Sequence, residues 1–259
     1  MCGRFTLRAA PQDVARHFLL FDVPSFSPRY NIGPGQVIGA VRAQSEWAPH
    51  AGHSDTVRQM QPQNESAMPS EISNREWAWF RWGLVPHWSR DPSIGSRLIN
   101  ARAETAASKP AFRSPARYRR CLIPADGFYE WKTVGRSKQP FFVYLHGNKL
   151  FALAGLWDYW QSPTGEILET CTILTVEPNP LIAKIHNRMP LILPPEAYNA
   201  WLDPALTEFD QLRQWLKPYP EEEMTTTPVS PYVNAFHNEG ARCLEPATTS
   251  DTLFSDESM

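Results

Sequence analysis

The sequence has few cysteines and no long apolar run. Its 259 residues include only 4 cysteines, widely spaced from Cys2 to Cys243, and no Cys-X-X-Cys pair. Such spacing is typical of a reduced protein rather than a disulfide scaffold. No apolar stretch is long enough to span a membrane, and the first residues lack the apolar core of a signal peptide. We therefore expect a cytoplasmic protein that does not bind membranes.

An excess of charge of either sign is also missing. The chain carries 25 Lys and Arg against 27 Asp and Glu, a net charge of −2. This balance excludes a surface that is basic all over, so any contact with nucleic acid must come from a local basic cluster. The densest such run lies at residues 113–120, with four arginines. It could extend a basic groove or be an ordinary solvated loop.

Histidines spaced for metal binding are absent as well. The only close pair, His50 and His53, lies in a polar segment, and zinc would need further ligands at suitable spacing. We expect no metal and no organic cofactor.

Short apolar segments separated by turn residues predict a single α+β domain, an antiparallel, barrel-like sheet with flanking helices. The expected strands are residues 3–8, 36–41, 75–85, 121–123, 127–132, 141–145, 151–159, 170–176, 191–193 and 228–236. The expected helices are 11–20, 103–107, 180–185, 195–202 and 207–215, and residues 25–35 are expected to be loop. We place the domain at 1–243, with a mobile polar insertion at 44–74 and a disordered tail at 244–259.

Tryptophan is plentiful, with 10 in the chain. In the strand at 75–85, alternation puts Trp77 and Trp79 on one side and Phe80 and Trp82 on the other. Some of these rings exceed what a core needs and are candidates for a binding surface.

The first residues carry the most distinctive chemistry. If Met1 is removed, Cys2 holds a free α-amine and a thiol on adjacent carbons, with reference pKa values of ~8 and ~8.5. An aldehyde can form an imine with this amine, and the thiol can then close a five-membered thiazolidine ring. An internal cysteine cannot do this because its nitrogen is an amide. The plain alternative is that Met-Cys occurs here by chance.

Three further clusters are richer in reactive side chains than structure alone needs. One is residues 100–105, with Asn100 and Arg102. Another is 127–132, where Glu130 lies beside large apolar rings; partial desolvation would raise its pKa and suit it to acid–base work. The third is 186–190, where His186 and Arg188 could present an imidazole and a phosphate-binding guanidinium together. An exposed edge-strand Glu, a capping His and a surface Arg are the alternatives.

Several motifs, taken in order, resemble those of the SOS response-associated peptidase family. They are Met1-Cys2-Gly3-Arg4-Phe5, Arg29-Tyr30-Asn31, Trp82-Gly83-Leu84-Val85-Pro86, Ile99-Asn100-Ala101-Arg102-Ala103-Glu104-Thr105, Arg120-Cys121-Leu122-Ile123-Pro124, Gly127-Phe128-Tyr129-Glu130-Trp131 and His186-Asn187-Arg188-Met189-Pro190. The resemblance runs from residue 1 to about residue 240 and leaves out the insertion and the tail.

This resemblance implies a sensor of DNA damage that crosslinks itself to abasic sites. Cys2 would be the nucleophile after Met1 is removed autocatalytically, which explains the word peptidase. Asn100 would position Cys2, Glu130 would be the acid–base carboxylate, and His186 would help to open the sugar ring and steady the adduct. An associated lyase activity is left open.

The resemblance also implies the partner. It is single-stranded DNA with abasic sites, or a junction of single and double strand, bound by a monomer that joins the nucleoid when on DNA if the source is bacterial. Arg4, Arg102 and Arg188 would hold phosphates, which positions a strand without reading its sequence. From the residues, Trp82 and Trp88 are candidates to stack on flanking bases, with ordinary sheet packing as the alternative.

Two other classes of protein compete with this interpretation. Class II glutamine amidotransferases also begin Met-Cys-Gly, but typically continue with Ile where this chain has Arg4. A glutaminase assay separates them. A non-catalytic binding module is the second competitor, and in that case Cys2→Ala would leave its function intact.

Overall fold

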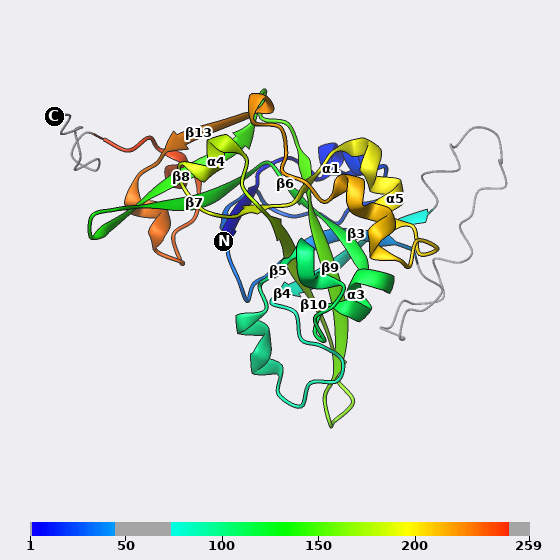
Figure 1. Cartoon of the computed structure of the whole chain (residues 1–259). Helices are drawn as coiled ribbons and strands as arrows, with labels where there is room; N and C mark the ends of the chain where they lie inside the picture. Colours follow the sequence, from blue (N-terminus) through cyan, green and yellow to red (C-terminus); the bar gives the residue numbers. More distant parts are fainter. Residues whose placement is uncertain (1, 45–73, 249–259) are drawn as a thin grey trace.

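A computed structural model describes residues 2–44 and 74–248 (Figure 1). The predicted insertion at 44–74 lies outside the described residues except for its two end positions, so that prediction is untested. Of the predicted tail at 244–259, residues 244–248 are described and bonded to the domain, since the Ser230 N–H donates to the Glu245 carbonyl and the Ala247 N–H to the Pro228 carbonyl. Residues 249–259 lie outside the described residues.

A closed barrel of five strands forms the centre of the fold. In order around the ring they are β10 (Ile167–Val176), β4 (Arg75–Trp82), β3 (Val37–Ala43), β6 (Arg120–Ala125) and β9 (Phe151–Gln161), and β9 pairs with β10 to close it. Small and branched apolar side chains at 0% exposure fill this part of the core, among them Ala40, Leu122, Ile123, Leu153 and Ile173. Burying such side chains is the main stabilising term of the fold.

Three short strands extend the barrel at one end. β5 (Asn100–Arg102) runs parallel to β10, β11 (Met189–Pro190) runs antiparallel to it, and β12 (Ile192–Leu193) pairs with β9. On β10, Thr175 is in register with both Arg102 and Pro190. Segments that are distant in sequence therefore meet across one strand.

A second sheet has five antiparallel strands. Their order is β13 (Met224–Pro228), β8 (Ser137–Leu145), β7 (Gly127–Val134), β1 (Arg4–Leu7) and β2 (Arg29–Ile32). β1 lies between β7 and β2, so the residues that follow Cys2 are held on both sides. Figure 1 shows the N-terminus emerging between this sheet and the barrel.

Short helices cover the sheets. The α-helices are α1 (Pro11–Phe18), α2 (Ala103–Ala106), α3 (Arg113–Tyr118), α4 (Pro180–Ala183) and α5 (Tyr198–Leu202). The 3-10 helices are η2 (Pro92–Arg97), η3 (Pro195–Ala197), η4 (Phe209–Trp215), η5 (Glu221–Glu223), η6 (Pro231–Asn234) and η7 (Ala241–Leu244). In α1, Pro11 occupies the first turn, where no backbone donor is needed, and Val14 and Phe18 are buried.

The predicted fold class is confirmed, with corrections in detail. The barrel is mixed rather than antiparallel throughout, because β10 pairs parallel with β4 and β5. The prediction of loop at 25–35 is wrong, since β2 lies within it. The prediction of a last strand at 228–236 is also wrong. The last strand, β13, comes before this segment and ends at Pro228, and a 3-10 helix begins at Pro231, because neither proline has an N–H to donate to a ladder.

A buried acid fixes the corner between barrel and second sheet. Asp126 links β6 to β7 and is 3% exposed. Its carboxylate accepts hydrogen bonds from the Thr6 hydroxyl at 2.5 Å, the Arg8 backbone N–H at 2.5 Å, Arg8 Nε at 2.9 Å and the Ala9 N–H at 3.1 Å. Asp126 therefore holds Thr6 near the end of β1 and the two residues that follow the strand, Arg8 and Ala9.

We predict that Asp126→Asn destabilises the protein strongly. The amide loses the charge that balances Arg8 and turns a donor toward backbone N–H groups, which should cost about 3–5 kcal/mol. Urea unfolding measures this. Asp13→Asn is the control, because Asp13 forms an exposed pair with Arg16 and should cost under about 1 kcal/mol. Small and equal losses of unfolding free energy in Asp126→Asn and Asp13→Asn would show that the Asp126 carboxylate does not hold the corner.

Candidate active site at the N-terminal cysteine

Cys2 lies buried at the start of β1, at 0% exposure. Its carbonyl oxygen accepts a hydrogen bond from Asn100 Nδ2 at 2.8 Å. Asn100 is the first residue of β5, so the barrel extension holds the backbone of Cys2 in place. Burial raises the pKa of the Cys2 thiol far above its usual range, and the nearby Glu130 carboxylate raises it further. The resting thiol is therefore neutral.

Glu130 lies in the interior strand β7 and is 1% exposed. Its neighbours Phe128 and Tyr129 are also buried, and burial raises the pKa of Glu130 to about 7. The predicted desolvated carboxylate is confirmed, and the alternative of an exposed Glu on an edge strand is wrong. A carboxyl that titrates near neutral pH can accept or give a proton under physiological conditions.

His186 lies in the loop after α4, and its ring contacts the backbone of the same loop. The backbone N–H of Arg188 donates to His186 Nδ1 at 3.0 Å. The same Nδ1 lies 3.2 Å from the Arg188 carbonyl oxygen, so Nδ1 accepts from the N–H or donates to the carbonyl according to the tautomer of the ring. Burial lowers the pKa of His186, so the neutral form dominates at pH 7.

A pocket of about 380 Å³ joins these groups. Its lining residues are Arg4, Glu130, Trp131, Lys138, His186 and Asn234. Cys2 itself does not line the pocket, but its thiol contacts the Arg4 carbonyl oxygen, and the Glu130 carboxylate raises its pKa. The pocket thus combines a carboxyl with a pKa of about 7, an imidazole and two cations near a buried cysteine, which suits a small anionic or carbonyl-bearing group.

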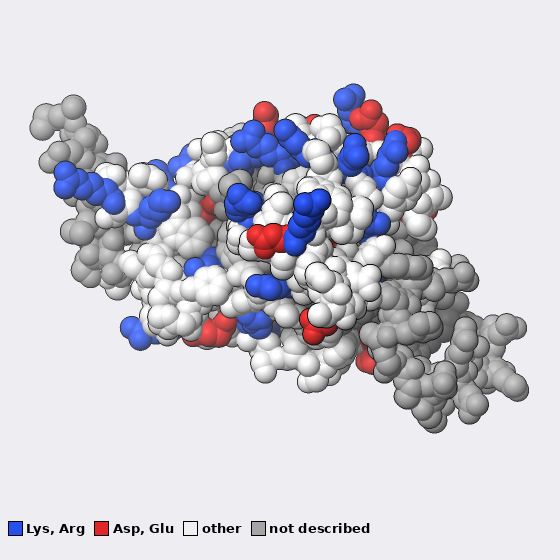
Figure 2. Space-filling model, turned by 90° about the horizontal axis from the view of Figure 1, so that it is seen from below, with Lys and Arg blue, Asp and Glu red and all other residues white. Residues whose placement is uncertain are grey.

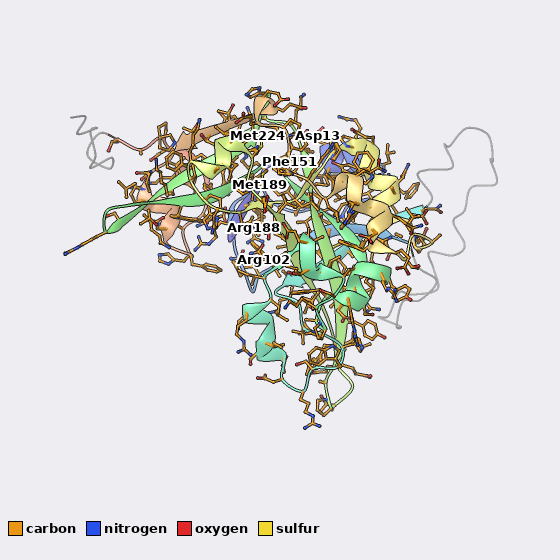
Figure 3. The ribbon with its side chains drawn as sticks, viewed as in Figure 1. Asp13, Arg102, Phe151, Arg188, Met189 and Met224 are labelled. Atoms are coloured by element: carbon orange, nitrogen blue, oxygen red, sulfur yellow. The ribbon has the colours of Figure 1, made fainter. Side chains whose placement is uncertain are left out.

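The three arginines predicted to hold phosphates are placed differently. Arg4 Nη1 donates to Asn31 Oδ1 at 2.7 Å and to the Val233 carbonyl at 3.1 Å. Arg188 makes a two-bond pair with Glu104 at 2.8 and 2.9 Å. Arg102 is exposed, and Figure 3 shows it close to Arg188. Arg102 is thus open to a ligand, whereas the other two are already bonded.

The two tryptophans predicted to stack on bases, Trp82 and Trp88, differ in their exposure. Trp82 is 1% exposed, packs edge-on against Phe5 and donates its indole N–H to the Ile99 carbonyl at 2.8 Å. The prediction that Trp82 stacks on a base is wrong, because its ring is enclosed in the core. Trp88 is 52% exposed, so its role stays a prediction.

The basic run at 113–120 serves mainly packing. Arg120 is 5% exposed and donates to the carbonyls of Ala116, Arg117, Trp201 and Asp203. Arg119 pairs with the buried Asp158. The run therefore does not extend a basic groove as a unit. Lys and Arg side chains are nevertheless frequent on the face shown in Figure 2, where red acidic groups are fewer.

Asn31 was missed as a site residue. It is 1% exposed, and its Nδ2 lies within hydrogen-bonding distance of the carbonyls of Asn238 at 2.8 Å, Ala235 at 3.1 Å and Val233 at 3.3 Å. Lys138 and Asn234 were missed too, although both line the pocket. In the sequence, the Arg29-Tyr30-Asn31 motif was the one signal that pointed to Asn31, and it did not indicate what the residue does.

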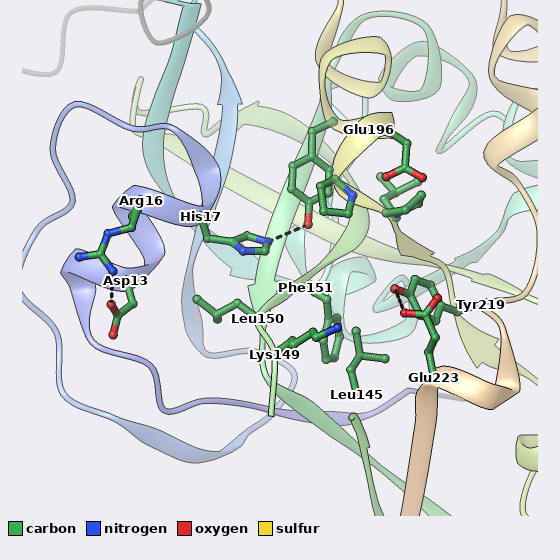
Figure 4. A pocket seen from close by; sticks show the side chains of 14 residues that line it. Asp13, Arg16, His17, Leu145, Lys149, Leu150, Phe151, Glu196, Tyr219 and Glu223 are labelled. Carbon is green, nitrogen blue, oxygen red and sulfur yellow. Dashed lines mark hydrogen bonds and ion pairs between the residues drawn. The ribbon is translucent and has the colours of Figure 1, made fainter. Parts of the chain in front are cut away.

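A larger pocket, of about 580 Å³, lies between α1, the β8–β9 turn and α5 (Figure 4). His17 and the Tyr198 hydroxyl, 3.2 Å apart, are among its lining residues. Neither pocket is lined by a cysteine, but the smaller one holds Glu130, whose carboxylate lies near enough to the Cys2 thiol to raise its pKa, so the smaller pocket is the better candidate for chemistry.

Within the described ranges, no three His, Cys, Asp or Glu side chains gather as a metal site would require. Over the same residues, no helix is long and apolar enough to cross a membrane.

Comparison with known proteins gives one consistent result. The family pattern described as SOS response associated peptidase (SRAP) matches residues 1–236. Abasic site processing protein YoqW of Bacillus subtilis (strain 168) is 38% identical over 249 residues, covering 95% of this chain and 99% of that protein. Abasic site processing protein HMCES of Gallus gallus is 36% identical over 201 residues, covering 68% of this chain and 59% of that protein.

A solved structure agrees with the described fold. The X-ray structure of a protein from Bacteroides thetaiotaomicron matches with a TM-score of 0.77 at 25% identity, covering 95% of this chain and 100% of that one.

The raised pKa of Glu130 predicts a pH-dependent cost to stability. Between its ordinary value of 4.5 and about 7, the folded state holds a proton that the unfolded state has lost, so stability falls as pH rises. Glu130→Gln removes this dependence. Relative to wild type, it should gain up to about 3 kcal/mol between pH 4 and pH 8. Urea unfolding across that range measures the gain.

The exposed Glu166 offers a matched control, because Glu166→Gln should follow the wild-type pH profile. Parallel profiles for wild type and Glu130→Gln would show that Glu130 ionises normally.

Proposed function

Since the chain belongs to the SOS response associated peptidase family, we propose that it processes abasic sites in DNA by a covalent link through Cys2. The observation that carries this proposal is the buried carboxyl of Glu130, with a pKa of about 7, beside a cysteine at position 2. A self-crosslinking DNA-damage sensor needs both groups.

The first step frees the amine of Cys2. Hydrolysis of the Met1–Cys2 peptide bond consumes one water and releases methionine. Glu130 as a carboxylate can take a proton from the attacking group and return it to the leaving amine. Asn100 meanwhile keeps Cys2 in place through its carbonyl oxygen, so the new terminus does not drift.

The second step joins protein and DNA. The free amine attacks C1′ of the ring-opened deoxyribose, and one water leaves to give an imine. His186 gives a proton to the ring oxygen in its protonated form, which is the minor form at pH 7 because burial lowers the pKa of the ring, and the neutral imidazole that results takes up a proton again from solvent.

The third step closes the thiazolidine. The sulfur of Cys2 adds to the imine carbon, and its proton ends on the nitrogen, so the joining of the processed protein to the DNA loses one water in all. Because burial makes a free thiolate costly, proton transfer and carbon–sulfur bond formation should be coupled, with Glu130 as the relay.

The DNA strand is held by charge rather than by base identity. Arg102 is exposed at the end of β5, the strand whose Asn100 bonds Cys2, and can contact a phosphate directly. Arg188 is held by Glu104, and a phosphate would have to replace that carboxylate. The preference for a strand junction, the monomeric state and the association with the nucleoid remain predictions.

The central prediction concerns Cys2. Wild-type protein incubated with a single-stranded oligonucleotide that carries one abasic site should give a heat-stable adduct on a denaturing gel. Its intact mass should equal protein lacking Met1 plus DNA minus one water. Cys2→Ala should give no such adduct, and Cys2→Ser should not give a thiazolidine.

Glu130→Gln belongs on the same gels and should slow adduct formation by on the order of 100-fold. If wild-type protein that begins at Cys2 gives no adduct, the proposal fails, and glutamine hydrolysis becomes the next activity to assay.

Arg102→Ala should weaken binding to single-stranded DNA and reduce its salt dependence. Losing one phosphate contact should lower the slope of log K against log salt by about 0.7. Fluorescence anisotropy across a salt series measures this slope. Arg16→Ala is the control, since Arg16 is equally a charged surface residue but lies on α1. An unchanged slope for Arg102→Ala would take Arg102 off the phosphate backbone.

A further inference from the structure

A carboxy-terminal loop, residues 229–246, folds over the second sheet beside the pocket; we name it the clasp. Its two ends meet, since Val229 forms an isolated bridge with Pro246 and the Ser230 N–H donates to the Glu245 carbonyl at 2.9 Å. Cys243 and Val233 anchor its underside at 0% exposure. A loop whose ends are joined and whose interior is packed is a defined surface element.

The clasp is tied to the strands that carry the site. Asn31 on β2 lies within hydrogen-bonding distance of three of its carbonyls, as described above, and the backbone N–H of Tyr30 donates to the Glu239 carboxylate. Trp131 on β7 donates its indole N–H to Asn234 Oδ1 at 2.7 Å. The clasp therefore sits in a fixed position relative to β1 and β7.

One apolar ring of the clasp faces solvent. Phe236 is 44% exposed, and its ring centroid lies 4.6 Å from Cζ of Arg4, a residue that lines the pocket. Gly33 packs against the same ring so closely that a Cβ there would come within 2.4 Å of it. The guanidinium and the glycine fix the orientation of the ring while much of its surface stays open.

We propose that Phe236 is a stacking platform for the nucleobase next to the abasic site. This inference rests on the proposed function and names a further contact of the same site. A base beside an abasic gap has lost one stacking neighbour, and an aromatic side chain can replace it. Arg4 beneath the ring holds it and adds positive charge near the strand. The large π surface of a purine fits this platform best.

Among the aromatic residues near the pocket, Phe236 suits the role best. Trp82 is enclosed in the core, and the Trp131 indole is engaged by the clasp itself. Stacking distinguishes bases by their size and not by their hydrogen-bonding groups. An abasic lesion occurs next to any base, so its recognition requires a contact of this kind.

The test is a double-mutant cycle between protein and DNA. One oligonucleotide carries a tetrahydrofuran abasic analogue, which has no aldehyde and cannot crosslink, flanked by adenines. In two others, the 5′ or the 3′ adenine is also replaced by tetrahydrofuran. Wild-type protein should lose on the order of 10-fold in affinity when the stacked adenine is removed. Phe236→Leu should bind the first oligonucleotide on the order of 10-fold more weakly than wild type does, and replacing the flanking adenine should weaken its binding no further.

Two further variants and one control sharpen the cycle. Gly33→Ala should act like Phe236→Leu because its Cβ displaces the ring, and Phe236→Trp should restore wild-type behaviour. The salt slope should stay unchanged in Phe236→Leu, since no phosphate contact is lost. Phe21→Leu is the matched control, because Phe21 is 85% exposed but lies outside the pocket lining.

The outcomes separate the inference from the function it rests on. If wild type forms adducts with natural abasic DNA but Phe236→Leu keeps full affinity and full sensitivity to the flanking adenine, the stacking role is overturned. If wild type forms no adduct at all, the proposed function itself fails, and the platform fails with it.

Discussion

The hydrogen bond from Asn100 to the carbonyl of Cys2 is the contact on which the site depends. The beginning of a chain is normally free to fray, because few contacts restrain it. Here β1 lies between two strands, Asp126 holds its far half, and Asn100 holds the residue before it. Cys2 is thereby placed with the precision of a strand rather than of a free terminus, as a group that must be held in one orientation toward a ligand requires.

The barrel brings the rest of the chemistry to that point. β10 pairs with both β5 and β11, so Asn100, Arg102 and the residues after His186 converge although they are far apart in sequence. Glu130 arrives from the other sheet, on the strand next to β1. The two sheets therefore contribute different parts, one the acid–base carboxyl and the other the backbone anchor and imidazole. Their fixed joint at Asp126 keeps these parts in register.

Much of this could be predicted from the sequence, and the exceptions have physical reasons. Local patterns located most strands and the buried environment of Glu130, because alternation and apolar neighbours are short-range signals. The parallel pairing of β10, the core position of Trp82 and the role of Asn31 depend on which distant segments meet, and no local pattern records that. Prolines at 228 and 231 do record the end of β13, and weighing them more heavily would have corrected the last strand.

The position of the clasp near the carboxy-terminus determines when the surroundings of Cys2 are complete. Asn31 and Val233 are separated by 202 positions, and the loop closes only when Pro246 reaches Val229. During synthesis, Cys2 leaves the ribosome first, but the wall of its pocket and the support of Arg4 leave almost last. A nascent or truncated chain thus carries Cys2 without the wall of the neighbouring pocket. Completing the candidate site therefore requires almost all of the described chain.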